Sequence, residues 1–130
     1  MLVDTPHNSL TKEIIGSAIE VHRALGPGLL ETAYVHCVQH ELSSRGLRWR
    51  AQQPIPIVYK DIALDVSYRL DLIVEDAVVV ELKCVDKLLS LHEAQLLTYL
   101  RFTGCPVGLL INFNVTKLTD GIRRLLNAHR

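Results

Sequence analysis

Two carboxylates and a lysine stand at a spacing that could support metal-dependent chemistry. Asp71 and Glu81 are ten positions apart, and Lys83 follows Glu81 by two. The segment between the acids reads as two apolar strands joined by a polar turn at residues 75–77. A turn centred on Asp76 pairs residues whose numbers sum to 152, so Asp71 would face Glu81. Their Cβ atoms would then lie about 5 Å apart.

Such a pair of acids needs compensation. Two carboxylates that face each other in an apolar sheet repel one another and lose hydration. A hard divalent cation held by oxygens of both would offset this, and Mg²⁺ suits such a site. Lys83 falls on the same face as Glu81 because strand side chains alternate. The other interpretation is a structural ion pair between the acids and the lysine.

The residues around the acids favour the metal site. The other face of the hairpin is wholly apolar: Leu70, Leu72, Val74, Val78, Val80 and Leu82. The charged face also carries Ile73 and Val79, so other elements are expected to cover both faces. Charges on a doubly covered sheet need an explanation that charges on a half-exposed sheet do not.

Length and composition limit the class of protein. The chain has 130 residues, 48% apolar and 22% charged, which predicts one globular domain over residues 1–130. Fourteen basic and fourteen acidic residues give a net charge of zero, which argues against tight, non-specific DNA binding. Two local basic clusters are interpreted as solvated surface rather than as a phosphate track. They are Arg45, Arg48 and Arg50, and Arg123, Arg124, His129 and Arg130.

The expected compartment is the cytoplasm. Cys37, Cys84 and Cys105 are odd in number and far apart, which suits reduced thiols better than disulfides or zinc ligands. No run of apolar residues is long enough to span a membrane, and the first residues lack the pattern of a signal peptide.

The elements predicted along the chain are helices and strands in the order α-α-β-β-β-α-β-α. Helices are expected over residues 10–25, 29–45, 90–103 and 118–128, and strands over 47–53, 55–60, the hairpin 64–85 and 107–113. Pro54 and Pro56 are expected to interrupt the early strand, and Ser90 with Glu93 has the spacing of a capping box. The strand-helix-strand unit over 78–113 predicts parallel pairing within a mixed sheet that has helices on both faces.

Polar residues on two of the helices could reach the acids. Glu31 and Tyr34 share a helix face in the pattern G-x-x-E-x-x-Y, although an acid in a first turn is also favourable for the helix dipole alone. His92, Gln95 and Tyr99 form a stripe on the third helix. Gln95 and Tyr99 could be a boundary pair, or they could hydrogen-bond to a phosphate or a carboxylate.

Taken together, these blocks resemble the GxxExxY family, a branch of the PD-(D/E)XK nuclease superfamily. The matching segments are LTKEIIGSAIEVHRALGPGLLETAY, YRLDLIVEDAVVVELKCVDKL, HEAQLLTYL and GLLINFNV. The resemblance covers almost the whole chain. It implies a restriction-endonuclease-like three-layer α/β/α fold with the core order α-β-β-β-α-β, plus an extra helix at each terminus.

The resemblance also implies roles for particular residues. Asp71 and Glu81 match the metal-binding acids, with Glu31 matching a helix-borne acid that assists at the metal. Lys83 matches the lysine that supports the attacking hydroxide. Gln95 and Tyr99 match the Q-x-x-x-Y motif of the RecB-like and lambda-exonuclease-like branch.

Two positions need separate comment. Leu70 replaces the proline of the superfamily name. His22 is similar to a histidine ligand of some RecB-like nucleases, but its position at the helix junction favours a structural role.

The function these implications favour is a Mg²⁺-dependent nuclease, with Mn²⁺ as a possible substitute, that hydrolyses phosphodiester bonds in nucleic acid, with DNA the expected substrate. The alternative is a catalytically silent interaction or assembly protein that keeps the fold. Neutral charge and small size favour this alternative, and a homodimer would enlarge the surface available for a substrate.

Overall fold

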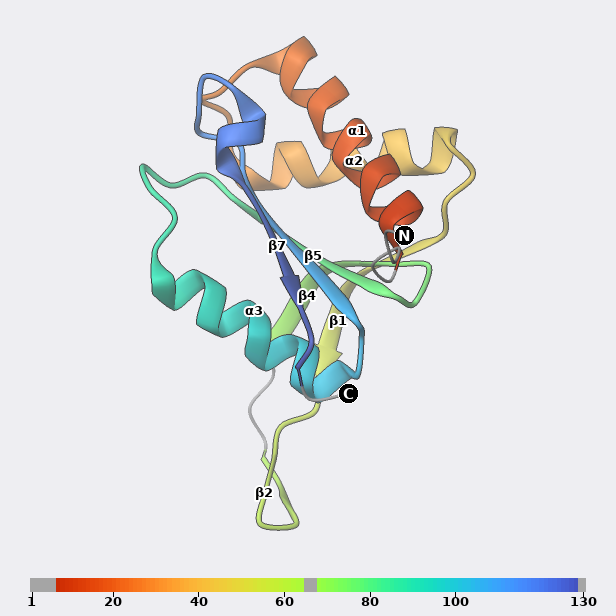
Figure 1. The fold of residues 1–130 in the computed structure, drawn as a ribbon, viewed down its shortest axis with the longest axis vertical. Helices are drawn as coiled ribbons and strands as arrows, with labels where there is room; N and C mark the ends of the chain where they lie inside the picture. Colours follow the sequence, from red (N-terminus) through yellow and green to blue (C-terminus); the bar gives the residue numbers. More distant parts are fainter. Residues whose placement is uncertain (1–6, 65–67, 129–130) are drawn as a thin grey trace, which may run out of the picture.

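The computed structural model describes residues 7–64 and 68–128. Three α-helices lie in these ranges: α1 (Asn8–Leu25), α2 (Glu31–Ser44) and α3 (Ser90–Thr103). The main sheet has the order β1-β4-β5-β6-β7. Its strands are β1 (Trp49–Ile55), β4 (Tyr68–Val74), β5 (Val78–Lys83), β6 (Val107–Asn112) and β7 (Ile122–Leu126). Two short strands, β2 (Val58–Tyr59) and β3 (Ile62–Ala63), form a separate hairpin that projects beyond the sheet (Figure 1).

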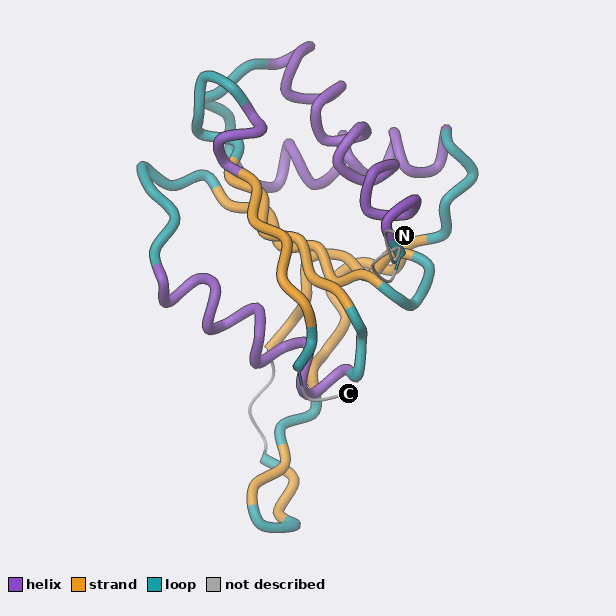
Figure 2. Tube along the Cα trace, viewed as in Figure 1, coloured by secondary structure: helices purple, strands orange, loops and turns teal. Residues whose placement is uncertain are grey.

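The sheet is the middle of three layers. One apolar cluster joins α1 and α2 to one face, through residues such as Ile14, Val38 and Val80. A second cluster joins α3 to the other face, through residues such as Leu96, Leu100 and Leu110. Figure 2 shows the twisted sheet between these helices. This is the α/β/α arrangement with a mixed sheet that the sequence predicted, since β5 and β6 are parallel and the other neighbours antiparallel.

The central hairpin has the predicted register. β4 and β5 pair as Leu72↔Val80, Ile73↔Val79 and Val74↔Val78, so the paired numbers sum to 152. Both residues at the tip of the turn, Glu75 and Asp76, have φ of 52°. Two successive positive φ angles give the type I′ turn, whose twist matches that of paired strands.

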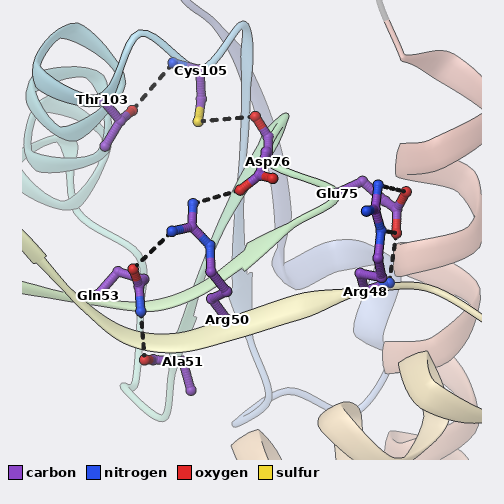
Figure 3. Close-up of polar contacts among 8 residues, drawn as sticks. All are labelled: Arg48, Arg50, Ala51, Gln53, Glu75, Asp76, Thr103 and Cys105. Atoms are coloured by element: carbon purple, nitrogen blue, oxygen red, sulfur yellow. Dashed lines mark hydrogen bonds and ion pairs between the residues drawn. The ribbon is translucent and has the colours of Figure 1, made fainter.

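Ion pairs and hydrogen bonds hold this turn, although it contains no glycine. Arg48 pairs with Glu75, and Arg50 pairs with Asp76 (Figure 3). From the other side, the Cys105 thiol donates to the Asp76 carbonyl oxygen at 3.9 Å. The positive φ angles of non-glycine residues are unfavourable in isolation. These contacts compensate and so help to fix the register that sets Asp71 against Glu81.

The same contacts account for the first basic cluster. Arg45 pairs with Glu13 at 3.2 Å, while Arg48 and Arg50 are committed to the turn. In the second cluster Arg123 donates to the backbone carbonyls of Asp120 and Ile122. His129 and Arg130 lie outside the described residues. The arginines of the first cluster are therefore engaged with the protein's own carboxylates, in line with the solvated-surface interpretation.

The predicted closing helix over residues 118–128 is wrong. A short 3-10 helix, η1 (Leu118–Gly121), leads into β7, which pairs antiparallel with β6 at the edge of the sheet. Ile122 packs with the cluster under α1 and α2, whereas Leu125 packs with the cluster under α3. A helix would place residues three apart on one face, but a strand places them on opposite faces.

Two local expectations also need correction. β1 continues through Pro54, which pairs with Arg69, because an edge strand tolerates a residue without an N–H. The predicted capping box is not formed by Ser90 and Glu93. The N-cap is Leu89, and its N–H donates to Nδ1 of His92 at 2.9 Å.

Gly108 allows α3 to lie close to the sheet. A Cβ at this position would come within 2.9 Å of Cγ and Cδ1 of Leu96. We therefore expect Gly108→Ala to lower the free energy of unfolding by about 1–3 kcal/mol through overpacking. Chemical denaturation measures this change, and Leu96→Val in the same background should recover part of it. An unchanged stability would show that α3 has room to move.

Candidate functional site

Asp71 lies where the ladder between β4 and β5 ends. The last backbone pair is Leu72↔Val80, and the next positions in this register are Asp71 and Glu81. Oδ2 of Asp71 accepts the Leu82 N–H at 2.9 Å, so a side chain bridges the strands where the backbone pairing stops. The two carboxyl groups are in hydrogen-bonding contact, which is one of the interactions that shift the pKa of Glu81. The structure thus brings this predicted pair together.

The side chains of β4 also change face at this point, so the expectation that Leu70 and Leu72 share one apolar face is wrong. Leu72 packs under α1 and α2, but Leu70 packs in the cluster under α3. Regular alternation would put both on one face. Gln52 of β1, which would face Asp71 in the β1–β4 register, has a positive φ of 52° and is absent from the ladder. The distortion of β1 at Gln52 accounts for the reversal of Leu70.

Glu81 is the most strongly perturbed acid of the site. It is only 5% exposed, and its Oε1 has no hydrogen-bond partner among the described residues. Burial, followed by the contact with Asp71, raises its pKa to about 9, although Lys83 acts in the opposite direction. A buried carboxylate oxygen without a partner is unfavourable unless a proton or a cation compensates it.

This shift has a consequence for stability. The folded protein keeps the Glu81 proton up to about pH 9, whereas the unfolded chain loses it near the ordinary value of 4.5. Without a bound cation, the fold therefore loses stability as the pH rises through this window. The oxygen atoms of Glu81 and Asp71 fit a hard divalent cation, which would replace the proton.

Lys83 ends β5 and is half-buried. Its carbonyl oxygen accepts the Phe113 N–H at 2.9 Å, which ties the end of β5 to β6. The pKa values of Glu81 and Glu31 are both raised overall, and the positive charge of the Lys83 ammonium opposes this rise in each. The lysine is therefore placed beside the acids, as the sequence predicted.

Asn112 is a positioning residue that the sequence analysis missed. It is 1% exposed, and its side chain accepts the N–H of Val85 at 3.1 Å and donates to the Val85 carbonyl at 2.9 Å. These bonds hold the chain just after Lys83 against β6. The available signal was a lone amide in an otherwise apolar strand, because a buried amide must find partners.

Glu31 approaches the site from the first turn of α2. Burial is the main cause that raises the pKa of Glu31, and the negative charge of Asp71 is the second. The pKa of the Cys84 thiol is raised mainly by burial and then by the charge of Glu31. Glu31 therefore lies near Cys84, at the end of β5. A role limited to the helix dipole would lower the pKa of an acid in the first turn. Burial and Asp71 therefore outweigh the dipole at this position.

The other residues of the G-x-x-E-x-x-Y pattern position Glu31. Gly28 has a φ of 105°, which glycine adopts without strain. The Tyr34 hydroxyl donates to the Gly26 carbonyl and accepts the Leu29 N–H at 3.2 Å, so it fixes the loop before α2. The Tyr34 ring stacks on Phe113 with centroids 4.4 Å apart. Tyr34 therefore acts through the loop and the core, a role that its spacing alone did not reveal.

His22 lies in the core between α1 and the chain after β6. It is 8% exposed, and its Nε2 is 2.8 Å from the Val115 carbonyl oxygen, to which it donates when it carries the proton. Its ring is 6.1 Å from that of Phe113. This placement agrees with a structural role for His22.

Tyr99 brings α3 to the acids from the other face of the sheet. It is 7% exposed, and burial, then Glu81, Tyr68 and Asp71, raise its pKa. Gln95, one turn earlier, is exposed, and its side chain acts in the opposite direction by lowering the pKa of Tyr99. His92 caps the helix instead of joining them. Of the predicted stripe, Tyr99 therefore reaches the acids, and Gln95 lies one turn away from it.

The acids do not form a three-residue metal group. Within residues 7–64 and 68–128, no three His, Cys, Asp or Glu side chains are arranged to hold one ion. Asp71 and Glu81 are thus the two acids in direct contact. Glu31 is close enough to act through its charge, and its predicted place as a direct ligand stays a prediction.

Comparison with known proteins agrees with this geometry. A sequence model of the PD-(D/E)XK nuclease superfamily matches residues 8–125, which include all the site residues described above. Comparisons with curated proteins and with solved structures gave no match. In the described part of the chain, no helix has the length and apolar character needed to cross a membrane. The match spans most of the chain and carries the acids, the lysine and the α/β/α core, so the chain belongs to the PD-(D/E)XK nuclease superfamily.

Proposed function

We propose that this protein is a Mg²⁺-dependent nuclease that hydrolyses phosphodiester bonds, with DNA as its expected substrate and Mn²⁺ as a possible substitute for Mg²⁺. Nucleases of this superfamily generally use divalent metal ions and act on nucleic acid. The observation that carries the proposal is the buried Oε1 of Glu81, which lies beside the Asp71 carboxylate and has no hydrogen-bond partner in the described part of the chain. Two adjacent buried carboxylates are more stable with a bound divalent cation than without one.

The protein's own groups would divide the work. Asp71 and Glu81 would hold the cation, which supplies positive charge to the phosphate oxygens and lowers the pKa of water. The Lys83 ammonium would orient the attacking water and stabilise the negative charge that develops on phosphorus oxygens. Tyr99 and Gln95 would hydrogen-bond to the substrate strand from the α3 side.

The finer family assignment is also a proposal. Gly28, Glu31 and Tyr34 act together at the start of α2, and the Gln95 side chain influences the pKa of Tyr99 one turn later. These relations support membership of the GxxExxY branch and likeness to the RecB-like and lambda-exonuclease-like nucleases. The homodimer and the cytoplasmic location stay predictions.

Cleavage with and without metal tests the proposed activity. The wild type is incubated with labelled single- and double-stranded DNA and RNA in Mg²⁺, in Mn²⁺ and in EDTA. We expect cleavage of at least one substrate in Mg²⁺ and none in EDTA. A Glu81→Gln preparation, purified in the same way, should be inactive, which excludes a contaminating nuclease.

The alternative is a catalytically silent interaction or assembly protein. Arg45, Arg48 and Arg50 are engaged with the protein's own acids, so they offer no free basic track for a nucleic acid. If the wild type binds cations but cleaves none of the four substrates, this alternative replaces the nuclease proposal.

Glu31 is expected to contribute more to cleavage than to cation binding. Glu31→Gln should lower the rate of cleavage by roughly tenfold or more, while the dissociation constant for Mn²⁺ changes by less than about fivefold. The reason is that Glu31 influences Asp71 but forms no three-acid group with it and Glu81. Glu41→Gln on the same helix is the control. A loss of cation affinity as large as that of Asp71→Asn would make Glu31 a direct ligand.

A further inference from the structure

A groove runs along α3 beside the candidate site. It has a volume of about 540 Å³, within the range of small-molecule binding sites. Three aromatic residues line it: Tyr68 from β4, and Tyr99 and Phe102 from α3. Gln95, Thr98 and His92 supply polar groups along the same lining. None of the described residues that line the groove is Asp, Glu, Lys or Arg.

The groove shares Tyr99 with the candidate site. Gln95 and Tyr99 line it, and Tyr99 is also the residue of α3 that responds to the charges of Glu81 and Asp71. The rings of Tyr68 and Tyr99 lie 6.5 Å apart and are tilted by 48°. Tyr68 is 45% exposed, so a large part of its surface is open to a ligand.

The lining indicates what the groove accepts. A phosphate needs cationic or multiple donor partners, whereas the described lining has no Asp, Glu, Lys or Arg and combines three aromatic rings with apolar and neutral polar side chains. A nucleobase has a flat π face that stacks on aromatic rings and polar edges that hydrogen-bond to amides and hydroxyls. Stacked and paired inside a duplex, a base cannot present its face in this way.

We propose that the groove takes an unpaired nucleobase of the strand whose phosphodiester lies at Asp71 and Glu81. This inference rests on the proposed nuclease function and specifies its substrate class. The strand to be cleaved must be single-stranded, or frayed, at the base next to the scissile phosphate. Tyr68 is then a specificity-determining residue, because its ring offers a stacking surface beside the site.

Binding to a single-stranded DNA decamer that carries one 2-aminopurine tests the proposal. Stacking of this base on an aromatic ring quenches its fluorescence. The titration is done in Ca²⁺ and in EDTA with the wild type, Tyr68→Leu and Tyr59→Leu. Tyr59 is 60% exposed on the β2–β3 hairpin and does not line the groove, so it is the matched control.

We expect quenching with the wild type and with Tyr59→Leu. Tyr68→Leu should lose the quenching and raise the dissociation constant by roughly tenfold, as expected for one stacked base. Ala94→Leu is a second variant, because Ala94 is exposed in the groove and leucine is nearly as good a helix former as alanine. It fills the groove without removing an aromatic ring and should weaken binding as well.

The outcomes separate the groove from the nuclease. Cleavage with equal quenching by Tyr68→Leu and Tyr59→Leu would overturn the inference and leave the nuclease proposal standing. Quenching that depends on Tyr68, without cleavage of any substrate, would support the groove and overturn the nuclease. Wild-type cleavage of blunt duplex DNA as fast as of single strands would also overturn the inference.

Discussion

The Lys83→Ala variant is expected to lose cleavage by about 100-fold or more while it still binds the cation. Lys83 carries a positive charge and cannot itself be a ligand of Mg²⁺. Its ammonium lowers the pKa of both Glu81 and Glu31, so it stands beside the acids and repels a cation there. Its removal therefore takes away the support for the nucleophile and leaves cation affinity unchanged or higher.

Single-turnover cleavage and calorimetric titration with Mn²⁺ separate these two effects. Lys87→Ala is the control, because Lys87 is an exposed lysine four residues further along the chain. Undiminished cleavage by Lys83→Ala would place the activity in another site or in a contaminant. A parallel loss of cation binding would show that Lys83 mainly maintains the structure of the site.

The Asp71→Asn variant is expected to behave differently and to lose cation binding and cleavage together. The change removes the charge from one of the two acids in contact, while Oδ1 of asparagine can still accept the Leu82 N–H that Asp71 accepts at 2.9 Å. The fold should therefore persist while the affinity for Mn²⁺ falls by about tenfold or more. Circular dichroism and titration with Mn²⁺ measure the two properties.

Asp86→Asn is the matched control for this second prediction, because Asp86 is an exposed aspartate near the end of β5. Retained cation affinity in Asp71→Asn, with cleavage lost, would show that Asp71 contacts the substrate and does not hold the metal.

The core of the site was predictable because a hairpin is a local structure. The turn at Glu75 and Asp76 sets the register, and the register alone places Asp71 next to Glu81. The helices around it were predictable from apolar periodicity and from the glycines that end them. The predicted bounds of α3 are those observed.

The parts that sequence could not predict depend on distant contacts. Ile122 and Leu125 fit either a helix or a strand, and only the free edge of β6 decides for the strand. The reversal of Leu70 depends on distortion in β1, about eighteen residues away in the chain. The role of Asn112 depends on Val85, which another helix separates from it in sequence.

Proton release on cation binding tests whether Asp71 and Glu81 hold the cation. Because the pKa of Glu81 is about 9 in the folded protein, a cation held by Asp71 and Glu81 must displace a proton at neutral pH. Mn²⁺ titrations near pH 7.5 in buffers with different ionisation enthalpies should show about one proton released per cation. The affinity should rise by up to about tenfold per pH unit below the pKa, and Glu81→Gln should bind the cation far more weakly. Binding that releases no proton, or that is unchanged in Glu81→Gln, would show that Glu81 does not hold the cation.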